Sequence, residues 1–527
     1  MRHDEVREGH AMGRRGLLVT GAASALTLGA VSFAGAAPHT DGEIRVVRGV
    51  LPPDAPDYVY LPVEVGRGVR ELAVSYGYER PAVPAGTPGN ALDIGIFDER
   101  GVALGGEGFR GWSGGARTSF FIRADDATPG YVAGPVRAGV WHIVLGPYTV
   151  APRGLPYEVT ITLRYGEPGR TPERIYPPER AGGRGRAWYR GDCHLHSWHS
   201  DGRRTPGEIA ALARAAGLDF IHTSEHNTHA GQPFWAEHAG DDLLILTGEE
   251  ITTRTGHVLA LGTDPGTFVD WRYRARENRF GRFAREIRRA GGLVVPAHPH
   301  ASCVGCGWKF GLGEADAVEV WNGSYTADDE VSLQAWDAAL ARGRWIPAMG
   351  NSDAHRDPDP VGGPQTVVLA EELTRAAVLE GLRRGRSYVV ESSAVSLALS
   401  AGDGRGRRAG IGERLRAAAD APVTVRFAVA GAPDGGSVRL VTEQGVLLTR
   451  AAADLEPGSG TGADRAAGAG ARARAGAGAG SDAGAGAGGW RGGEWRTGAG
   501  RAGYARLEVR HPSGRLAGFT NPVFLGG

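Results

Sequence analysis

The twelve residues GDCHLHSWHSDG, at positions 191–202, contain three histidines and two aspartates. Residues i and i+2 of a β-strand point to the same face, so His194 and His196 can approach one metal ion together if this segment ends a strand. Mixed histidine and carboxylate sites accept Zn, Mn and Fe. The segment therefore predicts part of a metal site whose other ligands come from elsewhere in the chain.

Further candidate ligands stand where apolar runs end. Eleven of the sixteen histidines lie between residues 191 and 355. The side chains that follow such a run are His226, Glu250, His298, Asp353 and His355. Strand ends converge on one face of a β/α barrel, and that face carries the site. Asp353 and His355 repeat the i, i+2 spacing, so the pattern predicts that they meet the first pair from the opposite side.

The sequence pattern of the segment that carries these residues predicts an α/β domain. From residue 188 to 390, strand-like apolar runs alternate with helical patterns, which predicts parallel β/α units. Thr205-Pro-Gly-Glu208 is a capping box with proline at the first helical position, and Gly217 ends the helix. The apolar run that begins at Phe220 then predicts a strand.

The flanking regions have all-β patterns. Short β-rich runs separated by Gly/Pro turns predict an N-terminal β-sandwich over residues 41–166, and residues 167–187 resemble a linker. Residues 391–527 predict a C-terminal β-sandwich-like domain. Its Gly/Ala-rich insert at 458–489 has few large apolar groups, so we expect it to be disordered. The fold class is thus multidomain α/β plus all-β.

The ordered set of motifs resembles a known family. His-x-His followed by Ser-Asp-Gly, then Thr-Ser-Glu-His, Gly-Glu-Glu-Ile with Gly-His-Val-Leu, Ala-His-Pro, Glu-Val-Trp-Asn-Gly and Asn-Ser-Asp-Ala-His, is similar to the PHP (polymerase and histidinol phosphatase) superfamily. Within it, the CehA/McbA branch of metallohydrolases is the best match. The resemblance covers residues 188–392, and the flanking domains rest on pattern alone.

This resemblance implies a distorted (β/α)7 barrel that holds two or three divalent ions, Zn, Mn or Fe. One ion would be held by His194, His196, Glu250 and Asp353, and a second by Glu250, His257 and His298. Asp201, His226 and His355 would hold a third. Many relatives have Thr-Asp-His where this chain has Thr-Ser-Glu-His, so Glu225 is expected to alter the surroundings of His226.

The net charge of the implied metal site restricts the class of substrate. Three carboxylate ligands leave a net charge of about +1 with two divalent ions and about +3 with three, which favours an anionic substrate. A small-molecule or polymeric phosphate mono- or diester fits best, attacked by a metal-activated hydroxide, with Glu250 and Asp353 in the catalytic centre. Arg356 is either a phosphate contact or a surface arginine. The alternatives are a carbamate or carboxylic ester hydrolase of the carbaryl-hydrolase type and a non-catalytic surface-binding protein.

The N-terminus resembles a twin-arginine export signal. Arg14-Arg15 precedes a mildly apolar run from Leu17 to Ala34, and Ala34-Gly-Ala36 offers a cleavage site, so residues 1–37 predict a signal peptide. Gly, Ser and Thr thin the run, which argues against a stable membrane span. The sequence therefore predicts a secreted or extracytoplasmic protein that uses the twin-arginine export machinery. Translation starts at Met1 or at Met12.

Composition limits the number of domains and the kinds of partner, and several residues outside the ligand set have alternative roles. The 527 residues imply two to four domains. Lys+Arg and Asp+Glu both number 59, so charge gives no case for nucleic-acid binding. Cys303 and Cys306 could form a disulfide, bind a metal ion together or only occupy positions in a loop. Cys193 is expected to be buried. Trp321 either lines the pocket or fills the core. Four other histidines are expected to lie outside the ligand set: His199, His222, His229 and His300.

Overall fold

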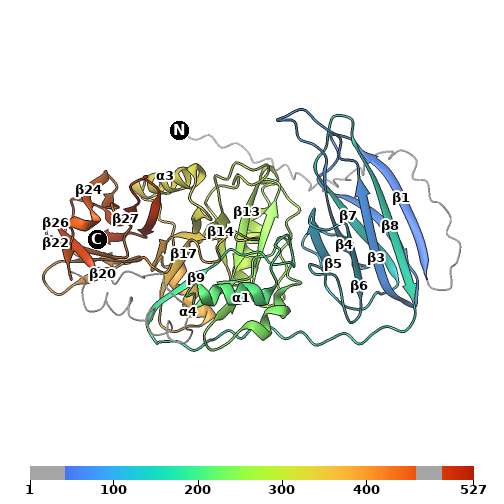
Figure 1. The fold of residues 1–527 in the computed structure, drawn as a ribbon, viewed down its shortest axis with the longest axis horizontal. Helices are drawn as coiled ribbons and strands as arrows, with labels where there is room; N and C mark the ends of the chain where they lie inside the picture. The colour runs from blue at the N-terminus through green and yellow to red at the C-terminus, as the bar shows by residue number, and fades with distance from the viewer. Residues whose placement is uncertain (1–41, 459–488, 527) are drawn as a thin grey trace, which may run out of the picture.

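A computed structural model describes residues 42–458 and 489–526. The predicted signal peptide, 1–37, and almost all of the predicted Gly/Ala-rich insert lie outside these residues. Sheets of residues 43–165 occupy one end of the molecule, the strands of residues 187–390 lie in the middle, and the C-terminal strands form the other end (Figure 1). No helix in the described ranges is long and apolar enough to cross a membrane.

The N-terminal region consists of two four-stranded antiparallel sheets, with orders β1-β8-β3-β6 and β2-β7-β4-β5. The strands are β1 (Glu43–Leu51), β2 (Val59–Val65), β3 (Val69–Tyr78), β4 (Ala91–Phe97), β5 (Phe109–Gly114), β6 (Ser119–Arg123), β7 (Gly139–Thr149) and β8 (Leu155–Tyr165). Both sheets contribute to one apolar core that includes Leu72, Ile94 and Trp141. Residues between Tyr165 and Ala187 form no named helix or strand.

The central region contains ten short strands. They are β9 (Ala187–Asp192), β10 (Phe220–His222), β11 (Leu244–Leu246), β12 (Glu249–Thr253), β13 (Gly256–Leu261), β14 (Leu293–Ala297), β15 (Val318–Asn322), β16 (Ala348–Asn351), β17 (Gln365–Ala370) and β18 (Ser387–Val390). Parallel pairing joins β10 to β9 and β11, and β15 to β16. Antiparallel pairing joins β13 to β12 and β14, and β17 to β9 and β18.

This pairing does not confirm the predicted (β/α)7 barrel. The central strands belong to three separate sheets, and several neighbours run antiparallel. The physical reason is local: β12 and β13 are joined by a tight turn at Arg254-Thr255, where a parallel connection would need a crossover of a dozen or more residues. An isolated parallel bridge between His226 and Glu250 links two of the sheets at the edge that carries the candidate ligands.

Within residues 42–458 and 489–526, four α-helices and three short 3-10 helices accompany the strands. They are α1 (Pro206–Ala215), α2 (Phe280–Arg289), α3 (Ala327–Ala341), α4 (Arg375–Arg383), η1 (Gln232–His238), η2 (Ala275–Glu277) and η3 (Ala452–Asp454). The capping box predicted for the first helix is confirmed, because the Thr205 side chain accepts from the backbone N–H of Glu208, whose side chain accepts from the Thr205 backbone. The strand predicted at Phe220 is also present as β10.

The C-terminal region forms a five-stranded sheet and also extends the central sheet. Its strands are β19 (Ser396–Gly402), β20 (Arg408–Gly410), β21 (Arg414–Leu415), β22 (Pro422–Ala430), β23 (Ser437–Thr442), β24 (Gly445–Ala451), β25 (Glu456–Pro457), β26 (Arg491–Gly498), β27 (Tyr504–Arg510), β28 (Leu516–Thr520) and β29 (Val523–Leu525). Pairing of β18 with β28 makes one continuous sheet across the boundary predicted near residue 390.

Candidate metal centre

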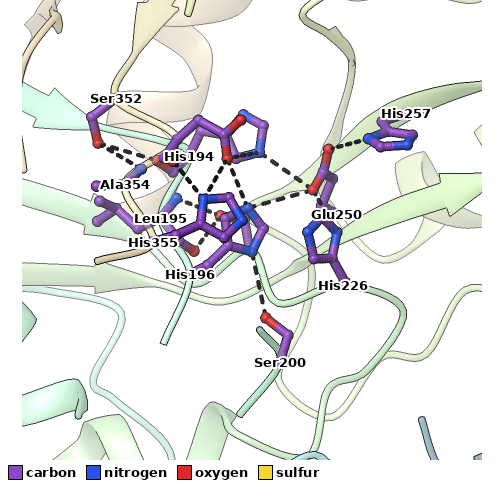
Figure 2. A network of polar contacts seen from close by, with 12 residues as sticks. His194, Leu195, His196, Ser200, His226, Glu250, His257, Ser352, Ala354 and His355 are labelled. Carbon is purple, nitrogen blue, oxygen red and sulfur yellow. Dashed lines mark hydrogen bonds and ion pairs between the residues drawn. The ribbon is translucent and has the colours of Figure 1, made fainter. Parts of the chain in front are cut away.

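The chain segments after β9 and β16 pair with each other and present four candidate ligands. Leu195 and Ala354 form a parallel bridge, and the backbone N–H of Asp353 donates to the carbonyl of His194. Because side chains alternate across this pairing, His194, His196 and His355 face the same space (Figure 2). Asp353 faces it too, since its Oδ1 is 3.3 Å from His194 Nε2. On both segments, residues i and i+2 therefore point into the same space, as their spacing predicted.

Glu250 on β12 lies at the centre of the remaining candidates. Its Oε1 is 3.0 Å from His257 Nδ1 and 3.2 Å from His298 Nε2. Its Oε2 is 2.8 Å from His226 Nδ1 and 3.4 Å from His194 Nε2. One carboxylate thus contacts histidines from four separate segments of the chain.

All nine predicted ligands lie together, in overlapping groups whose ligand atoms are within 4.8 Å of one another. The four groups are His196, Asp201, His226 and His355; His194, His298 and Asp353; His194, His196 and Glu250; and Glu250, His257 and His298. The first group differs from the predicted third set by the addition of His196. Two donors held at ~2.1 Å by a tetrahedral ion lie ~3.4 Å apart, and Asp353 Oδ1 is 3.3 Å from His194 Nε2 and 3.0 Å from His196 Nε2.

The donor atoms of these side chains fit divalent metal ions. Buried polar atoms are normally hydrogen-bonded, and each exception needs an explanation. Six candidate ligands each have a buried donor or acceptor atom without a hydrogen-bond partner among the described residues: His194 Nε2, His196 Nε2, Glu250 Oε2, His257 Nε2, His298 Nδ1 and Asp353 Oδ1. Imidazole nitrogens and carboxylate oxygens that converge in this way match the ligand chemistry of Zn, Mn and Fe.

The pKa shifts within the cluster also indicate that its buried carboxylates need positive charge beside them. Burial acts to raise the pKa of Glu250, but the charges of His226 and His194 outweigh it and hold the pKa well below its usual value. Burial acts to lower the pKa of His226, but Glu250 and Asp201 raise it to about 10. Burial lowers the pKa of His196 to about 3, so this imidazole stays neutral and keeps a free lone pair for an ion.

Two ligand positions have unusual backbone conformations. His298 has φ 27° and Asp353 has φ 49°, in the left-handed region that non-glycine residues rarely adopt. Each such residue costs of order 1 kcal/mol and is typically found at functional sites, where the surrounding structure enforces it. The backbone at these two positions is therefore held for the direction that it gives the side chains.

Glu319 on β15 is a functional candidate that the sequence analysis missed. It is 0% exposed, and its Oε1 lies 3.1 Å from His194 Nδ1. Its Oε2 accepts from the His298 backbone N–H at 2.8 Å. A carboxylate on the second nitrogen of a ligating histidine fixes the tautomer and the ring orientation. A single carboxylate inside the apolar run Ala317-Val-Glu-Val-Trp321 was the available signal, since buried glutamates are rare unless they are paired.

Glu225, which was expected to alter the surroundings of His226, organises the loop beside it. Its carboxylate accepts from the backbone N–H of Ser197 at 3.1 Å and from the Ser200 hydroxyl at 2.5 Å. His226 instead has Thr252 Oγ1 at 2.6 Å from its Nδ1. Glu225 therefore holds the turn that carries Asp201.

The structure places the other candidates outside the cluster. Arg356 is exposed, with its backbone N–H donating to Asp359. Trp321 is buried in an apolar core cluster, which favours the core-filler alternative. Cys303 and Cys306 form a disulfide, and Cys193 is a buried free thiol. The four histidines that were expected to lie outside the ligand set are absent from the ligand groups: His199, His222, His229 and His300.

Two cavities of the described residues lie away from the cluster. They have volumes of about 560 and 500 Å³ and lie between the N-terminal sheets, the segment around Arg174 and the loop that carries His229. None of the nine candidate ligands lines either cavity. Convergent buried donors identify a reaction centre more directly than volume does, so we assign the chemistry to the cluster.

Comparisons with known proteins give weak likenesses only. No protein-family model matches the chain, and no curated protein matches its sequence. A two-domain protein from Bacteroides vulgatus that contains a predicted PHP-like metal-dependent phosphoesterase is 18% identical, covers 51% of this chain and 83% of its own, and has a TM-score of 0.34. A candidate metal-dependent phosphoesterase from Bifidobacterium adolescentis is 20% identical over 38% of this chain and 93% of its own, with a TM-score of 0.25.

An amidohydrolase from Chromobacterium violaceum is 20% identical over 33% of this chain and 89% of its own, with a TM-score of 0.24. The TM-scores of these three proteins are too low to carry an argument about this chain. The case for a metal-dependent hydrolase therefore rests on the convergent histidine and carboxylate groups of the chain itself.

Proposed function

We propose that the chain is an exported, metal-dependent phosphoesterase of the PHP superfamily, related to the CehA/McbA branch. The observation that carries the proposal is the convergence of nine histidine and carboxylate side chains in four overlapping ligand groups. Two or three divalent ions, Zn, Mn or Fe, would activate water as a nucleophile and neutralise negative charge that develops on phosphorus.

The burial of the ligands indicates where a substrate approaches. The side chains of His194, His196 and Glu250 are 0% exposed, so they form the floor of the site. The side chains of Asp201 and His355 are 45% and 23% exposed and form its open side. A substrate therefore enters beside Asp201 and His355.

The proposed role of the ligands is to hold the ions and to leave that open side free for an anionic ester. Three carboxylates among the nine ligands compensate only part of the charge of two or three divalent ions, so a surplus of about +1 to +3 would attract a phosphate group. A carbamate lacks that negative charge. This charge balance is why we favour phosphate mono- or diesters over the carbaryl-hydrolase type of reaction.

A substrate panel tests the proposed reaction. Metal-loaded protein should hydrolyse 4-nitrophenyl phosphate or bis-4-nitrophenyl phosphate, lose that activity on treatment with a chelator, and regain it when metal is returned. Asp353→Ala is the control, because Asp353 Oδ1 contacts both His194 and His196 and its loss should remove metal and turnover together. Turnover of a 1-naphthyl carbamate alone would reject the phosphoesterase proposal.

Export is a separate part of the proposal and rests on Arg14-Arg15 and the apolar run after it. The twin-arginine pathway reads this pair directly. We expect Arg14→Lys combined with Arg15→Lys to keep the protein in the cytoplasm, whereas the unchanged chain appears outside it. Cell fractionation measures this difference, and equal export of both forms would contradict the assignment.

A further inference from the structure

Arg254 is a buried cation whose terminal donors are unused. It follows β12 at the turn into β13, and its side chain is 9% exposed. Neither Nη1 nor Nη2 has a hydrogen-bond partner among the described residues. Buried guanidinium groups are normally paired, because unmet donors cost free energy. The described residues therefore leave two buried donors of Arg254 without an acceptor.

Arg254 lies one residue beyond β12, the strand that carries the candidate ligand Glu250. The side chains at positions 250 and 252 of this strand point the same way. Glu250 is a candidate ligand, and Thr252 Oγ1 lies 2.6 Å from His226 Nδ1. With a rise of ~3.4 Å per residue, the backbone of Arg254 starts ~7 Å beyond Thr252. Its guanidinium thus belongs to the surroundings of the cluster without being part of it.

The N-terminal sheets complete the surroundings of this guanidinium. Asp93 Oδ2 lies 3.6 Å from Arg254 Nη2, and the ring of Tyr148 lies 4.1 Å from Arg254 Cζ. Asp93 pairs with Gly146 across β4 and β7, and a Cβ at Gly146 would come within 3.2 Å of Arg254 Nη2. The glycine therefore leaves the space that the guanidinium fills.

Asp93 balances the charge of Arg254 but does not occupy its donors. A separation of 3.6 Å is too long for a hydrogen bond. Burial raises the pKa of Asp93 to about 6, whereas the charges of Arg254 and His226 act in the opposite direction. The carboxylate thus lies within electrostatic reach of both the arginine and the metal-site histidine. A ligand carboxylate or phosphate could replace it by forming the two hydrogen bonds that Asp93 does not make.

We propose that Arg254 binds a second anionic group of the substrate, one that lies outside the metal cluster, and that Asp93 competes with this group for the guanidinium. The inference rests on the proposed function, because it assumes that one end of an anionic substrate lies at the cluster. It gives the N-terminal sheets a role in substrate specificity. The substrate class becomes phosphoesters that carry an additional carboxylate or phosphate on the leaving side.

Binding of two non-hydrolysable ligands tests this inference. Phenylphosphonate and 4-carboxyphenylphosphonate differ by one remote negative charge, and titration calorimetry on the metal-loaded full chain measures their dissociation constants. We expect the carboxylated ligand to bind about tenfold more tightly, as for a charge-assisted hydrogen bond pair. Arg254→Gln should abolish this preference, and Asp93→Asn should increase it because the competing charge is gone.

Arg274→Gln is the matched control. Arg274 also joins the central region to the N-terminal sheets, but its Nε and Nη2 donate to Asp57 at 2.5 Å, so its donors are already used. This variant should keep the preference for the carboxylated ligand. Equal affinity of the unchanged protein for both ligands, no binding of either, or a preference that survives Arg254→Gln would each overturn the inference.

Hydrolysis of phenyl phosphate, measured on the same samples, separates the two proposals. Hydrolysis without any binding preference leaves the phosphoesterase proposal standing and rejects the role of Arg254. A binding preference that depends on Arg254, without hydrolysis, supports the anion site and rejects the phosphoesterase proposal. The opposite shifts expected for Arg254→Gln and Asp93→Asn also distinguish ligand binding from a purely structural ion pair.

Discussion

Glu250→Gln is expected to remove at least one bound metal ion per chain and to lower turnover about a thousandfold, equivalent to about 4 kcal/mol of transition-state stabilisation. Glu250 belongs to two of the four ligand groups, one with His194 and His196 and one with His257 and His298. A glutamine keeps the shape of the side chain but replaces one acceptor oxygen by an NH₂ group, which cannot ligate a cation. Elemental analysis and initial rates measure the two effects.

Glu249→Gln is the control for this variant. Glu249 precedes Glu250 on β12 and accepts from the backbone N–H of Val269 at 2.5 Å instead of meeting a histidine. Burial raises the pKa of Glu249 well above its usual value, and a glutamine keeps an acceptor oxygen for the backbone N–H of Val269. This variant should keep its metal and its activity. If Glu250→Gln behaves like Glu249→Gln, the assignment of Glu250 as a shared ligand is wrong.

Glu319→Gln is expected to weaken metal affinity by about 10- to 100-fold while the fold is retained. The carboxylate contacts the Nδ1 atom of His194 and also accepts from the backbone N–H of His298, so it orients two candidate ligands at once. A glutamine offers one acceptor oxygen in place of two and loses the negative charge that makes the imidazole a better ligand. A competition titration with a metal-binding dye measures the change in affinity.

A purely structural role of Glu319 predicts a different result. In that case the unfolding temperature of the metal-free protein should fall, while its metal affinity stays unchanged. Glu249→Gln again serves as the control for loss of a buried carboxylate. Metal affinity of Glu319→Gln within twofold of the unchanged protein would contradict its role in positioning His194.

Local sequence signals predicted individual elements, and the nine side chains proposed as ligands lie together in the structure. The capping box at Thr205 and the strand at Phe220 depend on neighbouring residues only, and both are present. The i, i+2 spacing of His194 and His196 likewise follows from the geometry of an extended chain. The resemblance to the PHP superfamily supplied Asp201 and His257, and the structure brings them to the same cluster.

Features that depend on contacts between distant segments were not predicted. The antiparallel pairing of β17 with β9 replaces a parallel neighbour, and no local pattern sets the relative direction of two strands so far apart in the chain. Arg356 is exposed, and its contact with a phosphate group stays a prediction. Arg254 was missed because its partner Asp93 is 161 positions away in a region that was assigned only a structural pattern.

Anomalous X-ray diffraction from crystals of the metal-loaded protein tests the central claim most directly. The account predicts two or three metal peaks at the cluster, each within bonding distance of one of the four ligand groups, with Glu250 shared between two of them. Anomalous peaks only at other positions, or histidines and carboxylates of the cluster that bind each other and no metal, would contradict it.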